Sequence, residues 1–543
     1  MPPMMPLGRT SVEWAAGVVG ARATGVDRTI TLGTGRGGSH MVAARYVTEL
    51  VEAFERNGGR PALGSGPVVL SFRDVLDVAR RLAAVLVESG IGRGSGLACV
   101  AGTNRPEVLL VRIAAHLLGA RLTQVVTGPA LYGLDFVLRD CRPDLVLHDV
   151  PVPATGAPRL DLDEAVRRAG RRQAAPVPVG ARDEDVARVT YTGGTTGRPK
   201  GVASTFGAMA ARNSVRPAGW AKTDYLSVTS LAQRSGGRCL EQFRAGGRVE
   251  ILEPFGTLEF AAACRRLGPV STYLTTSMVY RLLDDPVTAH GVPGLEVVSY
   301  GDSPVHPERL REAVTRWGGR WRQGYGTNEA GVICRLTPAD HDAAVGGWPE
   351  LLGSVGRPVE GVEAEVRDER GGVVPAGRTG EVWTRSAAMM SGYWGRPGTT
   401  ALVLRDGWLR TGDLGHFDAD GYLYLDDRAV DVVMVDGDNV YCMPVEAALA
   451  RHPAVAQAAV VGRHSDATGE EVCAFLVPTA GCAPGAAAAD EACDLVERSL
   501  APAHRPTTVF WVREIPLTPR GKPDKRRLRA RAAAAAGGRA AGG

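Results

Sequence analysis

Residues 96–126 read GLACVAGTNRPEVLLVRIAAHLLGARLTQVV. This stretch consists of a short apolar run, a turn with Pro106 near a helix start, a helix, and a second apolar run. Such an order predicts two parallel strands joined by a right-handed crossover. The same order recurs at residues 269–283 and 294–326, so the sequence predicts an α/β fold built on layered sheets.

The regions on either side of this repeating pattern have different patterns of apolar residues and glycines. Residues 45–57 and 71–90 have helical spacing of apolar residues, whereas short strands with glycine turns follow residue 350 and predict a β-rich subdomain. A last segment mixes strands and helices and predicts a small α+β domain. The predicted division is a flexible extension (1–41, or sequence upstream of a start at Met41), a large N-terminal domain (42–429), a C-terminal domain (430–528) and a disordered, low-complexity tail (529–543).

The composition narrows the class of protein. The chain has 543 residues, 44% of them hydrophobic, which is enough for two or more globular domains. Its 63 basic and 59 acidic residues leave a net charge of only +4, so neither nucleic acid nor an anionic membrane is expected as a partner. No apolar run approaches the roughly 20 residues that cross a bilayer. Nine scattered cysteines without a CxxC pair predict a reduced, cytoplasmic protein without structural zinc.

A glycine-rich loop follows a strand-like run in VTYTGGTTGRPKGV, residues 189–202. The P-loop pattern GxxxxGK[ST] is absent, because Arg198 and Pro199 separate Gly197 from Lys200. The loop can still hold phosphate through close backbone approach at its glycines, threonine hydroxyls and the lysine charge. On these residues alone, a phosphate loop and a plain hairpin turn are equally good interpretations.

Further motifs follow in a fixed order: SYGDSPV (299–305), GYGTNEAG (324–331), TGD (411–413), DRAVDVVMVDGDNVYCMPVE (427–446) and PLTPRGKPDKRRL (516–528). Together with YTGGTTGRPKGV this set resembles the adenylate-forming superfamily, which includes acyl-CoA synthetases, adenylation domains and luciferases. Gly193 stands where that family commonly has serine. The resemblance covers nearly everything from residue 42 to 528 and implies that the C-terminal domain is a mobile lid over an ATP site.

The resemblance implies a two-step reaction. A carboxylate attacks the α-phosphate of ATP to give an acyl-adenylate and pyrophosphate, and a second nucleophile, usually a thiol, then displaces AMP. Catalytic roles are implied for Lys200 at the β- and γ-phosphates, for Glu329 as a Mg²⁺ ligand, and for Lys522 between the carboxylate and the α-phosphate. The other basic residues around Lys522 are expected to be a solvated tail.

The remaining implied ATP contacts come from five of the motifs. Tyr325 would stack on adenine, Asp413 and Arg428 would bind ribose, and Asn328 replaces the family's usual threonine near the α-phosphate. The full predicted set of ATP-binding residues is Thr192, Gly193, Gly194, Thr195, Thr196, Gly197, Asp302, Ser303, Pro304, Gly324, Tyr325, Gly326, Thr327, Asn328, Asp413 and Arg428.

Two positions depart from the family pattern. The hinge of the lid, often aspartate or lysine, is Val430 here, which places the control of the second step in question. In the acid pocket, TSLAQRSGG (229–237) puts Gln233 where many relatives have histidine, with Arg234 beside it, and offers no aspartate for an α-amino group. Arg234 is either a surface residue or the partner of a polar or anionic substrate feature, such as a hydroxyl, a nitro or a second acid group. The predicted pocket residues are Gln233, Arg234, Gly237, Tyr300 and Gly301.

The leading hypothesis is therefore ATP-dependent adenylation of an organic, aromatic carboxylic acid and its transfer to CoA, with ATP, Mg²⁺ and CoA as cofactors. One alternative keeps the adenylation but replaces CoA as the acceptor. The acceptor is then a carrier-protein thiol or an amine, or the enzyme activates nitrite for diazotisation of an aryl amine. A second alternative is an inactive nucleotide-binding regulatory homologue.

Overall fold

The three-dimensional structure is a computed structural model. It describes residues 43–126, 133–192, 199–212, 223–288, 290–301, 305–318, 320–428, 431–435, 438–465, 468–479, 481–482, 485–518 and 522–540. The expectation for residues 1–41 lies outside these ranges. Within them, no helix combines the length and the apolar character that a membrane crossing requires.

The stretch at residues 96–126 forms the predicted β-α-β unit inside a seven-stranded sheet of order β18-β8-β7-β4-β3-β5-β6. β3 and β4 pair in parallel, with Leu97 opposite Leu122, and helix α4 between them buries almost every side chain because it lies between two sheets. The strands are β3 Gly96–Ala101, β4 Arg121–Val126, β5 Leu145–His148, β6 Arg159–Asp161, β7 Val186–Thr192, β8 Lys200–Thr205 and β18 Gly392–Tyr393.

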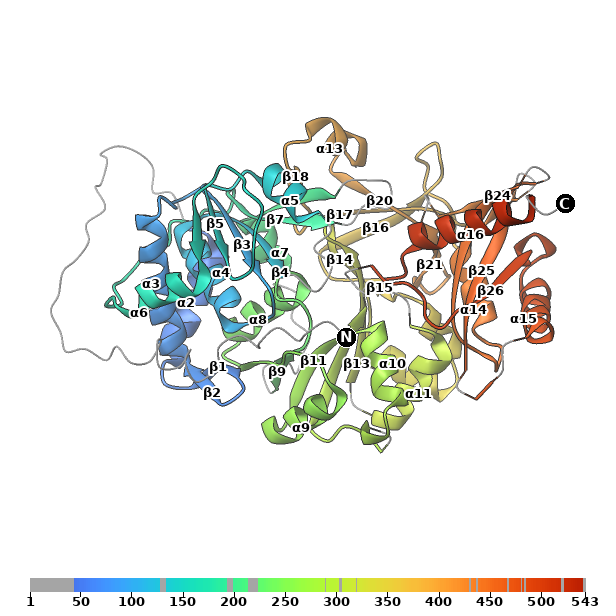
Figure 1. Cartoon of the computed structure of the whole chain (residues 1–543), viewed down its shortest axis with the longest axis horizontal. Coiled ribbons are helices and arrows are strands. Elements are labelled where there is room, and N and C mark those ends of the chain that lie inside the picture. Colours follow the sequence, from blue (N-terminus) through green and yellow to red (C-terminus); the bar gives the residue numbers. More distant parts are fainter. Residues whose placement is uncertain are drawn as a thin grey trace.

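A nine-stranded sheet lies beside the first, in the order β15-β14-β13-β12-β11-β9-β10-β1-β2 (Figure 1). Both further β-α-β predictions are confirmed here, since β11, β12 and β13 are parallel neighbours. The strands are β1 Pro61–Ser65, β2 Val68–Ser71, β9 Asp224–Ser227, β10 Val249–Ile251, β11 Val270–Thr275, β12 Leu295–Gly301, β13 Arg320–Thr327, β14 Gly331–Leu336 and β15 Arg357–Pro358.

Helices fill the space between and around these two sheets. One continuous core joins Leu82 of α3, Leu110 of α4 and Leu240 of α8 to strands of both sheets. The helices of this part are α2 Arg45–Asn57, α3 Phe72–Glu88, α4 Pro106–Leu118, α5 Leu134–Cys141, α6 Leu162–Gly170, α7 Phe206–Arg212, α8 Arg234–Arg244, α9 Thr257–Leu267, α10 Thr276–Asp284, η2 Pro286–Thr288, α11 Pro307–Trp317, α12 Pro338–Gly346 and η3 Pro349–Gly353.

The predicted β-rich subdomain follows residue 350. It is a five-stranded antiparallel sheet of order β16-β17-β20-β19, in which β21 also pairs with β20. Its elements are β16 Val362–Arg367, β17 Gly380–Ser386, α13 Pro397–Val403, β19 Leu404–Arg405, β20 Trp408–Phe417 and β21 Leu423–Arg428. The predicted fold class, a layered α/β body with a β-rich subdomain and a C-terminal α+β part, is thus confirmed.

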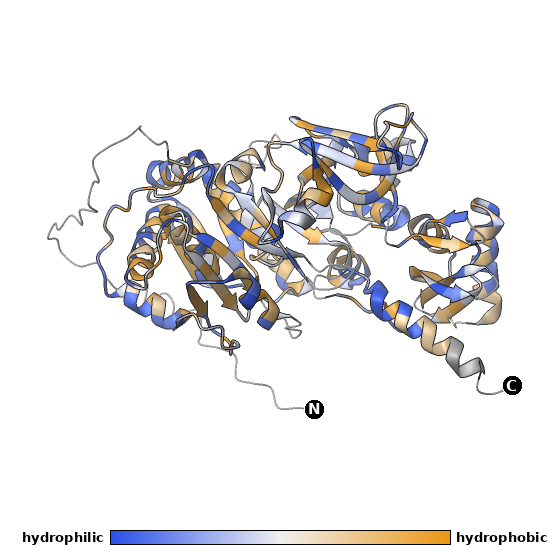
Figure 2. Cartoon of the chain, turned by 90° about the horizontal axis from the view of Figure 1, so that it is seen from above, coloured by the Kyte–Doolittle hydropathy of each residue, from blue (hydrophilic) through white to orange (hydrophobic). Residues whose placement is uncertain are grey.

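The C-terminal part is a separate α+β unit of order β23-β22-β25-β24, with β26 parallel to β25, at the opposite end of the molecule from the seven-stranded sheet (Figure 1). Hydrophobic residues gather in its strands, whereas its helices carry both hydrophilic and hydrophobic residues (Figure 2). Its elements are β22 Val433–Val435, β23 Asp438–Val440, α14 Cys442–Leu449, β24 Val455–Ser465, β25 Gly469–Pro478, α15 Ala486–Ser499, η4 Pro502–His504, β26 Thr508–Trp511 and α16 Lys525–Ala540.

The tail differs from the expected disorder. Helix α16 continues through Ala540, and both Leu528 and Ala532 are fully buried in a core cluster with Phe475. Alanine has the highest helix propensity, so an alanine-rich run forms a helix once one of its faces packs on a sheet. Low sequence complexity therefore misled the prediction for residues 529–540.

Candidate active site

The predicted phosphate loop connects two antiparallel strands. Thr192 ends β7 and Lys200 begins β8, and the two residues are directly opposite each other in the register. The loop residues Gly193, Gly194, Thr195, Thr196 and Gly197 lie outside the described residues. A P-loop joins a strand to a helix, so a hairpin geometry agrees with the missing P-loop pattern.

Lys200 and Glu329 meet at one aromatic ring. The Tyr393 hydroxyl donates to Oε1 of Glu329 at 3.1 Å, and Nζ of Lys200 lies 5.0 Å from the centroid of the Tyr393 ring. Burial, followed by the neighbouring Glu329 carboxylate, raises the pKa of Tyr393, so this hydroxyl stays a neutral donor. Tyr393 is held there by β18, which pairs with β8 beside Lys200. A cation and a carboxylate are thereby fixed on one tyrosine.

The turn that carries Glu329 is held through its backbone. The Arg212 guanidinium donates to the carbonyl of Asn328 at 2.9 Å and to that of Ala388 at 2.7 Å. The amide of Met390 donates to the carbonyl of Glu329 at 2.6 Å. Burial lowers the pKa of Arg212 to about 10, and the nearby Glu329 carboxylate acts in the opposite direction. These contacts leave the Glu329 side chain as the part of the turn that can reach a ligand.

Two other predicted residues shape the same turn. The Thr327 hydroxyl accepts the amide of Ala330 at 3.0 Å, so Thr327 organises the turn itself. A Cβ atom at Gly326 would lie 1.9 Å from the carbonyl oxygen of Gly331, which is shorter than any allowed contact. Glycine is therefore required at position 326 for β13 and β14 to approach each other so closely.

Tyr325, Asp413 and Arg428 form one connected group. The Tyr325 hydroxyl donates to Oδ2 of Asp413 at 2.7 Å, and Nε of Arg428 donates to Oδ1 at 3.0 Å. Asp413 of β20 and Arg428 of β21 are register partners. Burial first, and then the Asp413 carboxylate, raises the pKa of Tyr325. Residues predicted separately for adenine and for ribose thus share one hydrogen-bonded carboxylate.

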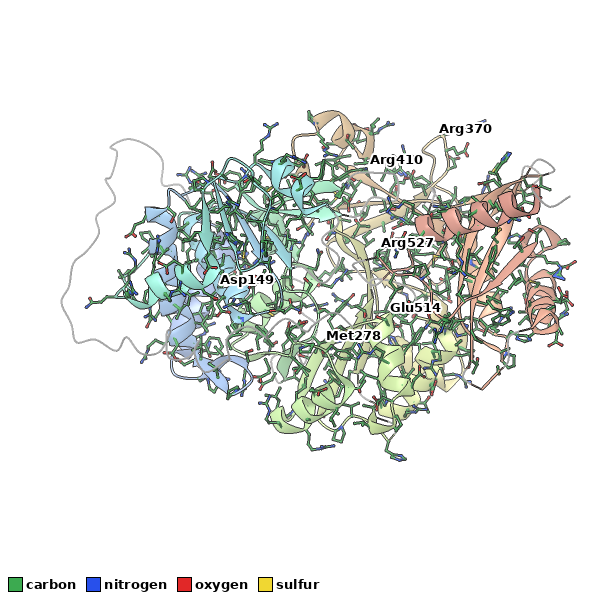
Figure 3. The ribbon with its side chains drawn as sticks, in the orientation of Figure 1. Asp149, Met278, Arg370, Arg410, Glu514 and Arg527 are labelled. Carbon is green, nitrogen blue, oxygen red and sulfur yellow. The ribbon has the colours of Figure 1, made fainter. Side chains whose placement is uncertain are left out.

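Lys522 lies in a short turn before α16. Its amide donates to the Thr518 hydroxyl at 3.2 Å, its carbonyl accepts the Thr518 amide at 2.7 Å, and its side chain is exposed. Arg527, in the first turn of α16, lies on the side of this helix that faces the large domain (Figure 3). The catalytic role of Lys522 stays a prediction.

The predicted hinge residue Val430 lies outside the described residues, as do Asp302, Ser303 and Pro304 of the predicted adenine segment. Directly after position 430, Asp431 is ion-paired with Arg529 of α16 at 2.5 Å. The carboxylate of Asp427 accepts the amide of Cys442 at 2.5 Å. The chain on both sides of position 430 is thus tied to the C-terminal unit.

The predicted acid-pocket residues separate into two groups: Arg234 and Gly301 lie on the cavity side, whereas Tyr300 turns its hydroxyl toward the core. Arg234, the first residue of α8 after Gln233, lies beside Gly324: a Cβ atom at Gly324 would be 3.8 Å from its Nη1. A Cβ at Gly301 would lie 2.9 Å from the Tyr273 hydroxyl, whereas Gly237 has open space on its Cβ side. Arg234 therefore points into a cavity at the ends of the parallel strands.

Tyr300, a predicted pocket residue, is among the residues that line the cavity, but its hydroxyl lies on the core side of β12. Its hydroxyl bonds Nε2 of His341 at 2.9 Å, and both residues are buried. Nδ1 of His341 donates a hydrogen bond to the Thr337 carbonyl, so Nε2 is the nitrogen that accepts a hydrogen bond from the Tyr300 hydroxyl. Successive residues of a strand face opposite sides of the sheet, and Tyr300 follows Ser299, which has the cavity-side orientation. The Tyr300 hydroxyl thus belongs to the core behind the pocket.

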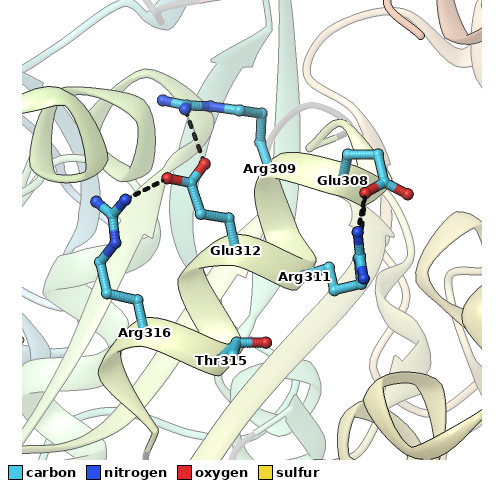
Figure 4. A pocket seen from close by; sticks show the side chains of 6 residues that line it. All are labelled: Glu308, Arg309, Arg311, Glu312, Thr315 and Arg316. Atoms are coloured by element: carbon cyan, nitrogen blue, oxygen red, sulfur yellow. Dashed lines mark hydrogen bonds and ion pairs between the residues drawn. The ribbon is translucent and has the colours of Figure 1, made fainter.

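A hollow of about 530 Å³ lies elsewhere, on the face of α11 shown in Figure 4. Its charged side chains pair with one another: Arg311 with Glu308 at 2.6 Å, and Arg309 and Arg316 with Glu312 at 2.8 and 2.5 Å. All lining residues come from one helix and satisfy their charges locally, so this hollow is a solvated ion-pair ladder.

The carboxylates of the candidate site could bind Mg²⁺ only together with the phosphates of a bound nucleotide. Over the described ranges, no group of three or more His, Cys, Asp or Glu side chains could hold a metal by itself. Mg²⁺ commonly takes one or two carboxylates plus phosphate oxygens and waters. Glu329, placed near Lys200 by Tyr393, is a suitable single carboxylate for such a complex.

With this geometry in hand, comparison with known proteins identifies the family. Residues 50–394 match the AMP-binding enzyme family and residues 444–522 match the AMP-binding enzyme C-terminal domain. The chain belongs to this family, the adenylate-forming superfamily, and its relatives include acid–CoA ligases. One is the medium/long-chain-fatty-acid–CoA ligase FadD8 of Mycobacterium tuberculosis, 33% identical over 89% of each chain. The family resemblance is confirmed.

Two solved structures are similar along nearly their whole length. The amide bond synthetase McbA K483A mutant from Marinactinospora thermotolerans has a TM-score of 0.79 and 32% identity, covering 90% of this chain and 99% of that one. The o-succinylbenzoate CoA synthetase MenE from Bacillus subtilis, in complex with ATP and a magnesium ion, has a TM-score of 0.76 and 25% identity, covering 88% and 98%.

Sequence reasoning missed Tyr393 and Arg212, which link the predicted residues. Tyr393 lies in GYWGRP, where a glycine next to aromatic residues was a usable signal. Arg212 ends an ordinary amphipathic helix and carries no comparable signal, because its role depends on the carbonyls of distant loops.

Proposed function

We propose that this enzyme uses ATP to adenylate an organic carboxylic acid, releases pyrophosphate, and transfers the acyl group to CoA. The observation that carries the proposal is the pair of linked groups around the β13–β14 turn: Lys200 and Glu329 on Tyr393, and Tyr325 and Arg428 on Asp413. The first suits phosphates with Mg²⁺, and the second suits a nucleoside. We call these six residues the nucleotide group.

In the first step, a carboxylate oxygen bonds to the α-phosphorus while the bond from that phosphorus to the bridging oxygen of pyrophosphate breaks. Lys200 and the adjoining loop would neutralise charge on the β- and γ-phosphates. Bound Mg²⁺ would supply further charge neutralisation on the phosphates. Asp413 and Arg428 would hold the ribose, so that the α-phosphate is fixed in position. Lys522 would approach from the C-terminal unit to stabilise the charge that develops at the α-phosphate.

In the second step, the CoA thiol loses its proton and its sulfur bonds to the acyl carbon, while the bond from that carbon to the phosphate oxygen breaks and AMP leaves. CoA is the proposed acceptor because FadD8 and MenE are named as CoA ligases. An aromatic acid is proposed because MenE is named for a benzoate and because Tyr273 contributes to the cavity lining. McbA is named an amide bond synthetase, so an amine is the acceptor to test against CoA.

The test is pyrophosphate release from Mg-ATP over a panel of aryl, fatty and amino acids, and nitrite with aryl amines, with and without CoA. Release with aryl acids that accelerates with CoA, together with a thioester mass, supports the proposal. If release does not depend on CoA and the product is an amide, an acylated carrier protein or a diazo compound, the acceptor is an amine or a carrier protein and not CoA. Absence of pyrophosphate release with every acid would overturn the proposal.

A further inference from the structure

The carboxylate of Asp140 connects two segments that carry residues of the nucleotide group. Its Oδ2 accepts a hydrogen bond from the Tyr191 hydroxyl at 2.7 Å, and its Oδ1 accepts one from the Arg396 guanidinium at 2.9 Å. Asp140 lies in the last turn of α5, Tyr191 lies in β7, and Arg396 directly precedes α13. One side chain thus holds together three elements that are far apart in the sequence.

The first of the two segments carries Lys200. The residue after Tyr191 is the register partner of Lys200, so a bond to Tyr191 holds the strand pair that presents this lysine. Helix α5 also begins beside Lys200, since a Cβ atom at its N-cap Gly133 would lie 3.9 Å from Cγ of Pro199. Burial first, and then the hydrogen bond to Asp140, raises the pKa of Tyr191, so its hydroxyl stays a neutral donor.

The second segment carries Tyr393, which contacts the cation and the carboxylate of the nucleotide group. The Arg396 amide donates to the Tyr393 carbonyl at 3.0 Å. The Thr400 hydroxyl accepts the Tyr393 amide at 2.9 Å and donates to the Arg396 carbonyl at 3.0 Å. The Arg396 guanidinium also lies 5.7 Å from the centroid of the Phe136 ring of α5. Because these bonds close a compact turn, a fixed Arg396 also fixes Tyr393.

The bonds of Asp140 are suited to hold both segments in place. The side chains of Asp140 and Arg396 are only 20% and 27% exposed, so water competes weakly for them. Hydrogen bonds to a charged group are shorter and stronger than those between neutral groups. Without this carboxylate, the Tyr191 strand and the Arg396 turn could shift relative to each other. A displacement of about 1 Å at a site that binds phosphates is enough to weaken it strongly.

We propose that Asp140 is a positioning residue for the phosphate end of the bound nucleotide. It keeps Lys200 and the Tyr393–Glu329 pair at a fixed separation, so that the cation and the carboxylate meet the β- and γ-phosphates and their Mg²⁺ together. The inference rests on the proposed function for the identity of the ligand. The nucleoside end belongs to Asp413 and its partners on β13 and β21, so the two ends of the nucleotide can be tested separately.

The test compares two ligands by calorimetry: Mg-ATP, and AMP, which lacks the β- and γ-phosphates. Asp140→Asn keeps the shape of the side chain and removes its charge. It should weaken Mg-ATP binding about tenfold and change AMP binding less than about twofold, whereas a general defect of the fold would weaken both. The matched control is Asp135→Ala, which removes a carboxylate that is 45% exposed and paired with Arg139 on the same helix, and it should bind both nucleotides like the wild type.

A second pair of variants reaches the same contact from the other side. Arg396→Met should also weaken Mg-ATP binding about tenfold and spare AMP, and Arg396→Lys should restore part of the loss, because lysine keeps the charge and loses the fork of donors. This pair decides the inference even if Asp140→Asn does not fold.

Equal losses for Mg-ATP and AMP, or wild-type affinity for Mg-ATP in both Asp140→Asn and Arg396→Met, would overturn the inference, while pyrophosphate release would still support the proposed function. If the wild type binds Mg-ATP but no acid releases pyrophosphate, the proposed function fails, and the two affinities still decide the inference. A wild type that does not bind Mg-ATP would overturn both.

Discussion

The nucleotide group and the arginine cavity, which is the small cavity lined by Arg234, Arg238, Arg322 and Arg335, are neighbours at the β13–β14 hairpin, yet different kinds of side chain build them. In the nucleotide group each cation has a carboxylate close by: Glu329 shares Tyr393 with Lys200, and Asp413 bonds Arg428. In the arginine cavity the lining side chains include four guanidinium groups, and Glu241, one turn along α8, lies 3.7 Å from Arg238. A group in which cations and carboxylates lie close together can be preorganised before its ligand arrives.

The largest expected effect concerns a residue that belongs to neither region. Lys522→Ala should lower the rate of pyrophosphate release by about 100- to 1000-fold, because one positioned cation at the α-phosphate is lost. ATP binding, measured by calorimetry, should persist because the nucleotide group is unchanged. Arg526→Ala is the matched control, since Arg526 is an exposed basic residue of the same segment. Wild-type turnover by Lys522→Ala would exclude the catalytic assignment.

A smaller effect should follow from breaking the link inside the nucleotide group. Tyr393→Phe removes the hydroxyl that donates to Glu329 and keeps the ring beside Lys200. We expect kcat/KM for Mg-ATP to fall about tenfold, with a higher Mg²⁺ concentration needed for half-maximal rate, because one hydrogen bond to a charged group is lost. Tyr393→Ala should be worse, since Lys200 also loses its aromatic contact. An unchanged Mg²⁺ dependence in both variants would show that Tyr393 is not part of the site.

The core behind the arginine cavity predicts a pH effect on stability. Burial lowers the pKa of His341 below its ordinary 6.5, so the folded state disfavours the protonated ring. Stability should therefore fall as pH drops below about 6.5 and be constant above it, as far as this group is concerned. His341→Gln should cost about 1 kcal/mol at pH 7.5 through loss of the Tyr300 hydrogen bond. In urea unfolding, that difference should shrink at pH 5.5, and an equal difference at both pH values would contradict the assignment.

The smallest expected effect is on the outer face of α11. Glu312→Ala removes the partner of both Arg309 and Arg316, and these side chains are about one-third exposed. Because exposed ion pairs contribute little, unfolding free energy should change by no more than about 0.5 kcal/mol, and pyrophosphate release should stay at the wild-type level. A loss of activity in this variant would mean that the α11 hollow contacts a substrate.

Most of the fold was predictable because its signals are local. The β-α-β order at residues 96–126 needs only apolar periodicity and a proline near a helix start, and the motifs SYGDSPV and GYGTNEAG begin in the last residues of β12 and β13. The alanine-rich tail was mispredicted for a related reason. Nothing in residues 529–540 reveals that Leu528 and Ala532 have a sheet to pack against.

The sequence by itself determined the order of strands and helices and the residues that mark an adenylate-forming enzyme, because periodicity and motif spacing are properties of neighbouring residues. Only the tertiary structure decided that Tyr393 joins Lys200 to Glu329, that Tyr300 faces the core, and that Arg238, Arg322 and Arg335 surround Arg234. These outcomes depend on strand register and on which face of a sheet a residue occupies. Register is set by the packing of segments that are distant from each other in the chain, so no local pattern records it.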